Sequence, residues 1–362
     1  DKILTNKFFV KIGLISYSLY LWHHPILSFG KISGLTENSL LLKFLLILIS
    51  FFLSFLTYSY IEKYFRNTNK INFKKLALII LAIIFSFIFL TNILVEKQKN
   101  KYPLILQNLY DRTWFTTKQY HKPCFQRKKF FCFFGNSENQ HTVFLVGDSI
   151  LASLQEELKN NLIERQINFI PMTNAGCDFL NSKEQNKFCN KNIQLNRHNK
   201  IRQFNEAIII IHLNYKTNGN DINKINSYLN NINKYLDLGY KVIVINPIPQ
   251  WNKNISQEIH KIYKNKKRNF LNEFSEKEEI SLDYKDYSDK TSKITEKLKE
   301  LSHKNLFFIH PDEIFCNIKE KNKCLAHSLE NIYFTDTSHL SKVGSRKINS
   351  ELIKLIEKIN YK

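Results

Sequence analysis

The chain has 362 residues, 43% of them hydrophobic, which is enough to bury a core in one large domain or two smaller ones. Its 53 Lys and Arg residues against 32 Asp and Glu residues give a formal net charge of +21. These basic residues are dispersed among Asn and Ile and form no long run with interleaved aromatic side chains, so we expect no nucleic-acid partner.

Three long apolar runs lie within the first 95 residues, at 12–30, 40–61 and 76–95. Each approaches the roughly 20 residues that a helix needs to cross a bilayer, so the sequence predicts three transmembrane helices in residues 1–95. The loop between the second and third runs is basic and holds one acidic residue, Glu62; its basic residues are Lys63, Arg66, Lys70, Lys74 and Lys75. By the positive-inside rule this loop is predicted to be cytoplasmic, which places everything after residue 95 outside the cytoplasm.

All six cysteines lie beyond residue 95 and form three local pairs, Cys124 with Cys132, Cys177 with Cys189, and Cys316 with Cys324. Close, even pairing predicts three disulfides in an oxidising compartment. Zinc ligation is the alternative, but no C-x2-C or Cys/His cluster with the usual spacing occurs, and we expect no metal site.

The stretches ISYSLYLWHHPIL (15–27) and SFLTYSYIEKYFR (54–66) resemble the last two helices of the membrane acyltransferase family 3. The sequence departs from that family at His24, where Trp is common, and at Tyr64, where Pro is common. The resemblance implies that residues 1–95 close a core of roughly ten membrane helices whose earlier members precede this chain. It also implies an acyl donor such as acetyl-CoA on the cytoplasmic side, with no tightly bound cofactor.

His23 and His24 are candidates for chemistry because histidines inside a membrane are often functional. The alternative is structural, since the pair stands near a helix end where side chains reach the headgroup level.

Residues 142–362 predict an α/β domain with a doubly wound, flavodoxin-like parallel sheet. Apolar runs rich in β-branched residues alternate with helical stretches. The predicted strands are 142–147, 167–173, 206–213, 240–249 and 305–311, and the predicted helices are 150–165, 221–237, parts of 254–304, and 341–360. Residues 96–141 are predicted to form a linker or extension, to which the sequence assigns no fold.

A serine nucleophile is predicted at Ser149, which follows the first strand within Gly147-Asp148-Ser149. A serine hydroxyl needs a base within hydrogen-bond reach and a group that orients the base. Asp336 and His339, three residues apart before the last helix, supply both in the logic of a catalytic triad. Either motif alone is weak, because Asp and Ser after a strand often cap the next helix.

Together the two motifs resemble the SGNH hydrolase superfamily, since the second continues as His-Leu-Ser-x-x-Gly through Gly344. The resemblance implies that Ser149 is the nucleophile, His339 the base and Asp336 the orienting acid, with Asp148 supporting the turn. It also implies an oxyanion hole formed by Ser149, Gly176 and Asn214. For Asn214 the usual Gly-x-Asn-Asp context is missing, and a polar residue that merely ends a buried strand is an equal alternative.

The two resemblances together imply an envelope polysaccharide O-acyltransferase, acting for example on lipopolysaccharide, in the inner membrane of a bacterium with its C-terminal domain in the periplasm. Its expected partners are membrane lipid, an envelope glycan acceptor and the preceding transmembrane helices. An acyl group, acetyl in the simplest case, would pass through an acyl-serine intermediate. A periplasmic carbohydrate esterase and a non-catalytic, membrane-tethered glycan-binding module are the alternatives.

Overall fold

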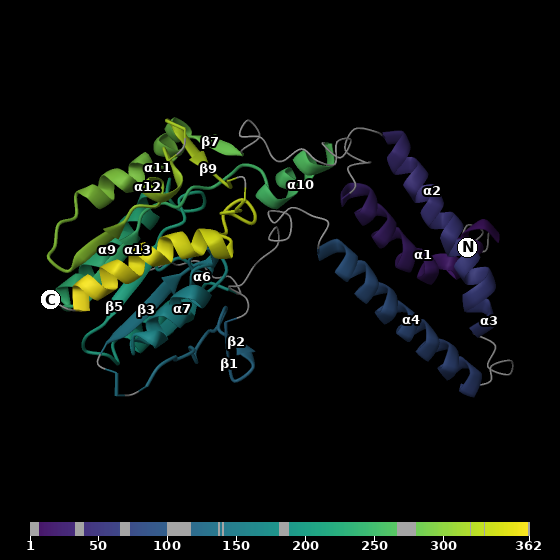
Figure 1. The fold of residues 1–362 in the computed structure, drawn as a ribbon, viewed down its shortest axis with the longest axis horizontal. Helices are drawn as coiled ribbons and strands as arrows, with labels where there is room; N and C mark the ends of the chain where they lie inside the picture. The colour runs from purple at the N-terminus through teal and green to yellow at the C-terminus, as the bar shows by residue number, and fades with distance from the viewer. Residues whose placement is uncertain are drawn as a thin grey trace. The chain divides into compact units, whose positions relative to one another are not determined.

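The computed structural model describes residues 7–32, 40–65, 73–99, 117–136, 138–139, 141–180, 188–265, 280–318, 320–328 and 330–360. The chain divides into two compact units, Asp1–Gln98 and Lys99–Lys362 (Figure 1).

The first unit is helical, with α1 (Lys7–Ile32), α2 (Leu40–Leu56), a π-helical turn η1 (Thr57–Glu62), α3 (Lys63–Phe65) and α4 (Phe73–Lys99). α1 and η1 contact each other through polar side chains: Ser18 Oγ donates to Glu62 Oε2 at 2.8 Å, and Trp22 Nε1 donates to Thr57 Oγ1 at 2.8 Å. His23 bonds through Nδ1 to the Leu19 carbonyl of its own helix, a contact that fits the structural alternative.

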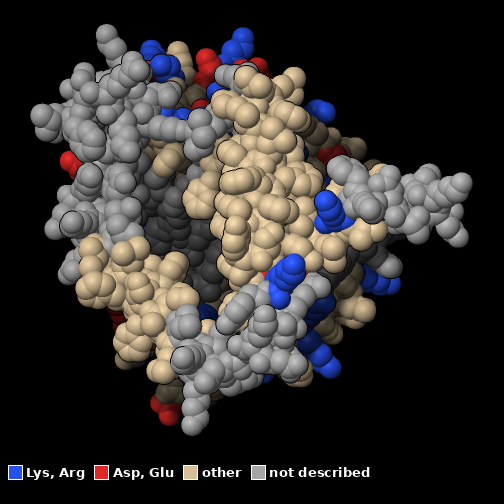
Figure 2. Space-filling view, turned by 90° about the vertical axis from the view of Figure 1, so that its right-hand side faces the viewer, with Lys and Arg blue, Asp and Glu red and all other residues tan. Residues whose placement is uncertain are grey.

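Much of the surface of these helices is apolar. Phe29, Leu40 and Phe85 are each at least 70% exposed, and Figure 2, which looks onto this side, shows a broad uncharged surface. Leu40–Glu62, with a mean hydropathy of 2.5, is the one helix among the described residues that is long and apolar enough to span a bilayer. The predicted spans at 12–30 and 76–95 are helical but fall short of that criterion, so they stay predictions. The predicted cytoplasmic loop falls largely on residues 66–72, outside the described residues.

The second unit is built on a five-stranded parallel sheet with the order β4-β3-β5-β6-β8. Its strands are β3 (Thr142–Gly147), β4 (Asn168–Thr173), β5 (Ile208–His212), β6 (Lys241–Ile245) and β8 (Leu306–Ile309). This is the flavodoxin-like order, in which the second strand along the chain lies outside the first. The predicted parallel sheet is confirmed, and all five predicted strands are present. β3 has the predicted bounds, the other four are shorter than predicted, and the strand predicted over 240–249 ends at Ile245.

Helices cover both faces of the sheet because its central strands are apolar on both sides. Alternate residues of β3 serve opposite faces: Val143 and Leu145 belong to one buried cluster, Phe144 and Val146 to the other. The first face is covered by α6 (Ser149–Ala152), α7 (Gln155–Glu164), α10 (Ile255–Asn265), α12 (Pro311–Phe315) and α13 (Lys342–Asn360). The second is covered by α8 (Lys191–Ile201), α9 (Ile222–Asp237) and α11 (Tyr284–Lys299).

The helices predicted over 221–237 and 341–360 are present as α9 and α13, each beginning one residue later than predicted. The other predicted helices differ more. The helix predicted over 150–165 divides into α6 and α7, since the chain turns at Ser153 and Leu154. In the region 254–304, α10 and α11 flank residues 266–279, which lie outside the described residues. A short strand, β7 (Ser281–Asp283), precedes α11 and pairs with β9 (Lys323–Leu325); the sequence pattern did not indicate either.

The segment predicted as a linker contacts the sheet in its described part. It contains the two-residue strands β1 (Lys118–Gln119) and β2 (Lys122–Pro123), and Phe134 exchanges backbone hydrogen bonds with Phe169 of β4 at 2.8 and 2.9 Å. This contact covers part of the open edge of the sheet, which would otherwise present unpaired backbone groups.

All three predicted disulfides are present: Cys124–Cys132, Cys177–Cys189 and Cys316–Cys324. The described residues include no free cysteine. Such usage is typical of a domain that folds outside the cytoplasm.

Candidate active site

The turn from β3 into α6 places Ser149 at the carboxyl edge of the sheet. Asp148 caps the helix: it is 2% exposed, and its Oδ1 accepts hydrogen bonds from the Ile150 and Leu151 N–H groups at 2.9 and 3.4 Å. A Cβ at Gly147 would lie 2.7 Å from Leu151 Cδ1, so a larger residue here would require the Leu151 side chain to shift. Ser149 is therefore the first residue of the helix, with its side chain half-buried.

A second turn before α13 carries Asp336 and His339. Asp336 Oδ1 accepts from the N–H groups of Ser338 and His339, both at 2.9 Å, and Thr335 N donates to the His339 carbonyl at 2.9 Å. Because one carboxylate oxygen closes the turn, the other is left to face the imidazole ring.

The two turns meet. Ser149 Oγ lies 2.8 Å from His339 Nε2, and His339 Nδ1 lies 2.8 Å from Asp336 Oδ2. An ionised carboxylate only accepts, so Nδ1 carries the ring proton and Nε2 can accept from the Ser149 hydroxyl. The side chains of His339 and Asp336 are 20% and 14% exposed, so a substrate can reach the site.

Asp336 stays ionised at neutral pH. Burial by itself raises the pKa of this carboxyl, but the hydrogen bond and the Coulombic attraction of His339 and the two backbone N–H groups outweigh that effect and lower the pKa to about 2. A negative Asp336 can stabilise a protonated His339 without taking its proton.

Packing fixes the Asp336 turn relative to the Ser149 turn. The backbone N–H of Trp251 donates to the Thr337 carbonyl at 2.8 Å, and the centroids of the Trp251 and Phe334 rings lie 4.1 Å apart at a tilt of 48°. From α13, Ser345 Oγ donates to the Ser153 carbonyl at 2.6 Å.

Gly344 allows this approach of α13. A Cβ at this position would lie 2.0 Å from the Tyr333 carbonyl oxygen. The glycine of the His-Leu-Ser-x-x-Gly motif is thus required by close backbone contact.

Gly176, predicted to line the oxyanion hole, lies in the turn that follows β4. Its φ of +57° is in the left-handed region that favours glycine, and the residue is exposed. Among the described residues no hydrogen bond from its N–H is found, and its part in the oxyanion hole stays a prediction.

Asn214, the other predicted oxyanion donor, lies two residues beyond the end of β5 and contacts Asp148. Its Nδ2 donates to Asp148 Oδ2 at 3.1 Å, and its Oδ1 accepts from Gln250 Nε2 at 3.0 Å. One amide hydrogen is thus engaged with the cap of the nucleophile turn, and the second is the one that could face an oxyanion.

Beneath these turns lies a buried arginine that the sequence reasoning missed. Arg197 of α8 is 0% exposed; it donates to the carbonyls of Gly147 at 2.9 Å and Cys177 at 3.0 Å, and to Asn174 Oδ1 at 3.3 Å. Burial lowers its pKa to about 10, so it remains charged. No local pattern in α8 marks this role, because apart from Gln194 of the same helix its partners lie 19 to 50 residues away in the chain.

Asp178, a second buried group missed from the sequence, lies beside Arg197. Burial first, and then the charge of Asp148, raise the pKa of its carboxyl well above the usual range. Its Oδ2 accepts from the Asn214 N–H at 3.2 Å and from Asn218 Nδ2 at 2.5 Å. This carboxyl therefore fixes the backbone at the end of β5.

The described residues contain no cluster of three or more His, Cys, Asp or Glu side chains that could hold a metal ion. The chemistry that this arrangement supports is that of an activated serine: a nucleophile, a base and an orienting acid in line, with N–H groups of a helix start and a glycine turn nearby.

Residues 119–354 match the sequence model of the family described as "SGNH domain (fused to AT3 domains)". The match covers well over half of the chain. The chain belongs to this family. The matched segment of the SGNH domain contains all three members of the triad, Ser149, Asp336 and His339. The membrane helices lie outside it, so their likeness to acyltransferase family 3 stays a prediction.

Solved structures with a similar fold include the periplasmic domain of a lipopolysaccharide acetyltransferase from Salmonella ser. Paratyphi A. It is 20% identical with a TM-score of 0.48, over 60% of this chain and 85% of that one. Another is the acetyl xylan esterase AlAXEase, 16% identical with a TM-score of 0.34, over 59% of this chain and 99% of that one. A search of curated proteins found no match.

Proposed function

We propose that this SGNH domain transfers an acyl group, acetyl in the simplest case, to a hydroxyl of an envelope polysaccharide on the outer side of the inner membrane. The observation that carries the proposal is the 2.8 Å approach of His339 Nε2 to Ser149 Oγ, with Asp336 on the other ring nitrogen. A non-catalytic binding module would have no need of this alignment.

In the first half-reaction, Ser149 Oγ attacks the carbonyl carbon of the acyl donor while His339 Nε2 takes the hydroxyl proton. Asp336 stabilises the resulting imidazolium through Nδ1–H. In this proposal the N–H groups of Ser149 and Gly176 stabilise the oxygen that gains negative charge, with the second amide hydrogen of Asn214 as a third donor. The tetrahedral intermediate collapses, the leaving group takes the proton from His339, and acyl-Ser149 remains.

In the second half-reaction, a sugar hydroxyl gives its proton to His339 Nε2 and attacks the acyl-Ser149 carbonyl. The new ester leaves with the sugar, and Ser149 Oγ recovers the proton. If water attacks in place of the sugar, the same groups hydrolyse the acyl enzyme. Hydrolysis is therefore the second candidate, and the family's name, which describes SGNH domains fused to AT3 domains, favours transfer.

We propose that the first unit of the chain is the end of a membrane core that delivers the acyl group from a cytoplasmic donor such as acetyl-CoA. The apolar helix Leu40–Glu62 and the exposed apolar side chains of this unit support a membrane location. In this proposal the three disulfides place the SGNH domain on the oxidising side.

The proposal is tested by replacing the gene in the source bacterium with a Ser149→Ala variant and measuring ester-linked acyl groups on the envelope polysaccharide by mild alkaline release. Loss of these groups, together with labelling of the wild-type chain but not the variant by a serine-reactive phosphonate, supports transfer through Ser149. Unchanged acylation in Ser149→Ala cells contradicts it, and increased acylation indicates the esterase.

A further inference from the structure

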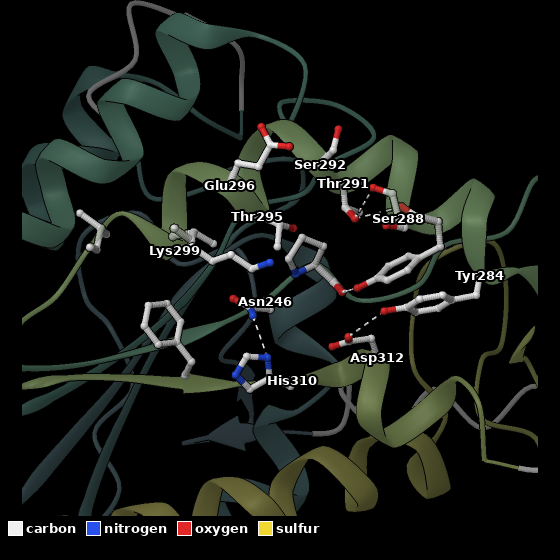
Figure 3. Close-up of a pocket in the computed structure, with 15 residues that line it drawn as sticks. Asn246, Tyr284, Ser288, Thr291, Ser292, Thr295, Glu296, Lys299, His310 and Asp312 are labelled. Atoms are coloured by element: carbon white, nitrogen blue, oxygen red, sulfur yellow. Dashed lines mark hydrogen bonds between the residues drawn. The ribbon is translucent and has the colours of Figure 1, made fainter. Parts of the chain in front are cut away.

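An elongated groove lies between α11 and the edge strand β8, and we call it the α11 groove. Its volume is about 340 Å³, at the lower end of the range for small-ligand sites. Asn246 and His310 lie along one side and Tyr284, Ser288, Thr295 and Lys299 of α11 along the other (Figure 3). None of the three triad residues lines it.

One end of the groove reaches the carboxyl ends of the strands, the side of the sheet that carries the nucleophile. Asn246 directly follows β6 and His310 directly follows β8, as Ser149 follows the end of β3. With about 4.8 Å between neighbouring strands, the ends of β6 and β8 lie roughly 10 and 15 Å from the end of β3 along this edge. A single sugar cannot span that distance, whereas a glycan chain can.

The shape of the groove also fits a chain. Its lining residues recur on successive turns of α11 from Tyr284 to Lys299. At a rise of 1.5 Å per residue they extend over roughly 22 Å. A linear ligand would contact this whole length, and a compact one only part of it.

The lining chemistry suits a neutral, hydroxyl-rich ligand. Asn246 Nδ2 donates to His310 Nδ1 at 3.1 Å, and both side chains line the groove with groups that can pair with hydroxyls. Thr295 adds a hydroxyl that can donate or accept, and the half-buried Tyr284 ring adds an apolar face.

The charges along the groove have both signs. Glu296 and Asp312 supply carboxylates and Lys299 an ammonium group. Since no single sign dominates, an anionic ligand such as a phosphate gains little here, and a neutral sugar is favoured.

One short segment joins the groove to the triad. It begins at Asn246 in the groove wall; Gln250 then donates to Asn214 Oδ1 at 3.0 Å, and the Trp251 N–H donates to the Thr337 carbonyl of the Asp336 turn. Tyr287 of the groove also donates to the Pro247 carbonyl at 2.6 Å. A ligand held by this wall is therefore positioned by the same segment that supports the catalytic turn.

We propose that the α11 groove binds the acceptor glycan chain, several sugar units away from the hydroxyl that receives the acyl group. This inference rests on the proposed transfer function and names a binding site for its acceptor. Ester cleavage of a small substrate needs only the triad and the oxyanion donors, so it should not depend on the groove.

The test compares Thr295→Trp, which fills the groove, with Lys293→Trp, an exposed position of the same helix that does not line it. Each variant replaces the chromosomal gene, and envelope acyl esters are measured by alkaline release. The purified full chain is assayed in parallel on 4-nitrophenyl acetate. We expect Thr295→Trp to lower envelope acylation about tenfold or more while its hydrolysis of the small ester stays within about twofold, and Lys293→Trp to match wild type in both assays.

Tyr284→Ala is the second variant, in case Thr295→Trp disturbs packing and loses both activities. It removes an aromatic contact without adding volume, and it should lower envelope acylation and spare the small ester. Wild-type acylation in both Tyr284→Ala and Thr295→Trp overturns the groove assignment. If a Ser149→Ala strain keeps its acyl esters, the proposed transfer function is wrong. The groove assignment is then wrong as well, because it rests on that function.

Discussion

Arg197 and Gly147 are joined by a hydrogen bond of 2.9 Å from the guanidinium Nη2 to the carbonyl oxygen, two residues before the nucleophile. The other guanidinium nitrogen, Nη1, donates to the Cys177 carbonyl, one residue after the glycine of the predicted oxyanion hole. A single rigid group thus sets the distance between the Ser149 turn and the Gly176 turn.

Substitution of Arg197 by Lys should therefore impair catalysis more than substrate binding. Lys retains the charge but cannot donate to both carbonyls in the planar geometry of Arg. We expect kcat for 4-nitrophenyl acetate to fall about 10- to 100-fold with little change in KM, since small misplacements near reacting groups have effects of this size. Arg202→Lys, at an exposed position at the end of α8, is the matched control and should behave as wild type. Equal kcat values for Arg197→Lys and wild type would show that the two turns keep their distance without this group.

Replacement of Asp336 by Asn should reduce activity while the turn still forms. The amide oxygen can accept from the turn N–H groups, but the amide nitrogen donates toward His339 Nδ1 and favours the tautomer that cannot accept from Ser149. By analogy with other triads the rate should fall on the order of 10²- to 10⁴-fold. The rate of phosphonate labelling of Ser149 measures this directly, and labelling at the wild-type rate would exclude Asp336 as the orienting group.

The lowered pKa of Asp336 also predicts a pH dependence of stability. A carboxyl with a pKa of about 2 in the folded chain and near 3.8 when unfolded stabilises the fold above the unfolded value, by about 2 kcal/mol. This stability is lost as the pH falls from about 4 toward 2. The difference in unfolding free energy between wild type and Asp336→Asn, measured by urea titration, should be constant from pH 7 to 5 and shrink below pH 4. A difference that grows on acidification would contradict the assigned direction of the shift.

Substitutions of Asn214 test two roles for this residue, positioning Asp148 and donating a hydrogen bond to the oxyanion. If it only positions Asp148, Asn214→Ala should slow the reaction and Asn214→Ser, whose shorter hydroxyl can still donate, should recover part of the rate. If it also donates to the oxyanion, Asn214→Ala should lower kcat by about 10²-fold, the effect typical of losing one such donor, with KM unchanged. Steady-state kinetics on 4-nitrophenyl acetate give both constants. Wild-type values for Asn214→Ala would exclude both roles.

The Cys177–Cys189 disulfide should support activity as well as stability, because it ties the Gly176 turn to the start of α8, the helix that carries Arg197. Closing a loop with a sequence separation of 12 stabilises a fold by about 3 kcal/mol in the chain-entropy estimate. Replacing both cysteines with Ser should lower the melting temperature and the rate. Cys316 and Cys324, which join α12 to β9, are the matched pair. Replacing both with Ser should lower the melting temperature and leave the rate unchanged. Equal catalytic effects of the two replacements would argue against a role for the Gly176 turn.

Local signals in the sequence were sufficient for much of this protein. Short apolar runs marked all five strands of the sheet, and their alternation with helical stretches implied parallel pairing. Gly147-Asp148-Ser149 and Asp336-x-x-His339 each specify a turn through their own side-chain hydrogen bonds, so they were recognisable without tertiary structure. The cysteine pairs were equally local, with separations of 8 to 12 residues.

Only the tertiary structure decided which distant groups meet. Arg197 donates to the carbonyls of Cys177 and Gly147, 20 and 50 residues away, and Asn246 and His310 are hydrogen-bonded although 64 residues separate them. Strand order and the paths of loops create such neighbours, and neither leaves a periodic or capping pattern at the residues concerned. The sequence therefore determined the elements and the chemical groups at their ends, whereas packing across the sheet decided the support beneath the nucleophile and the groove beside it.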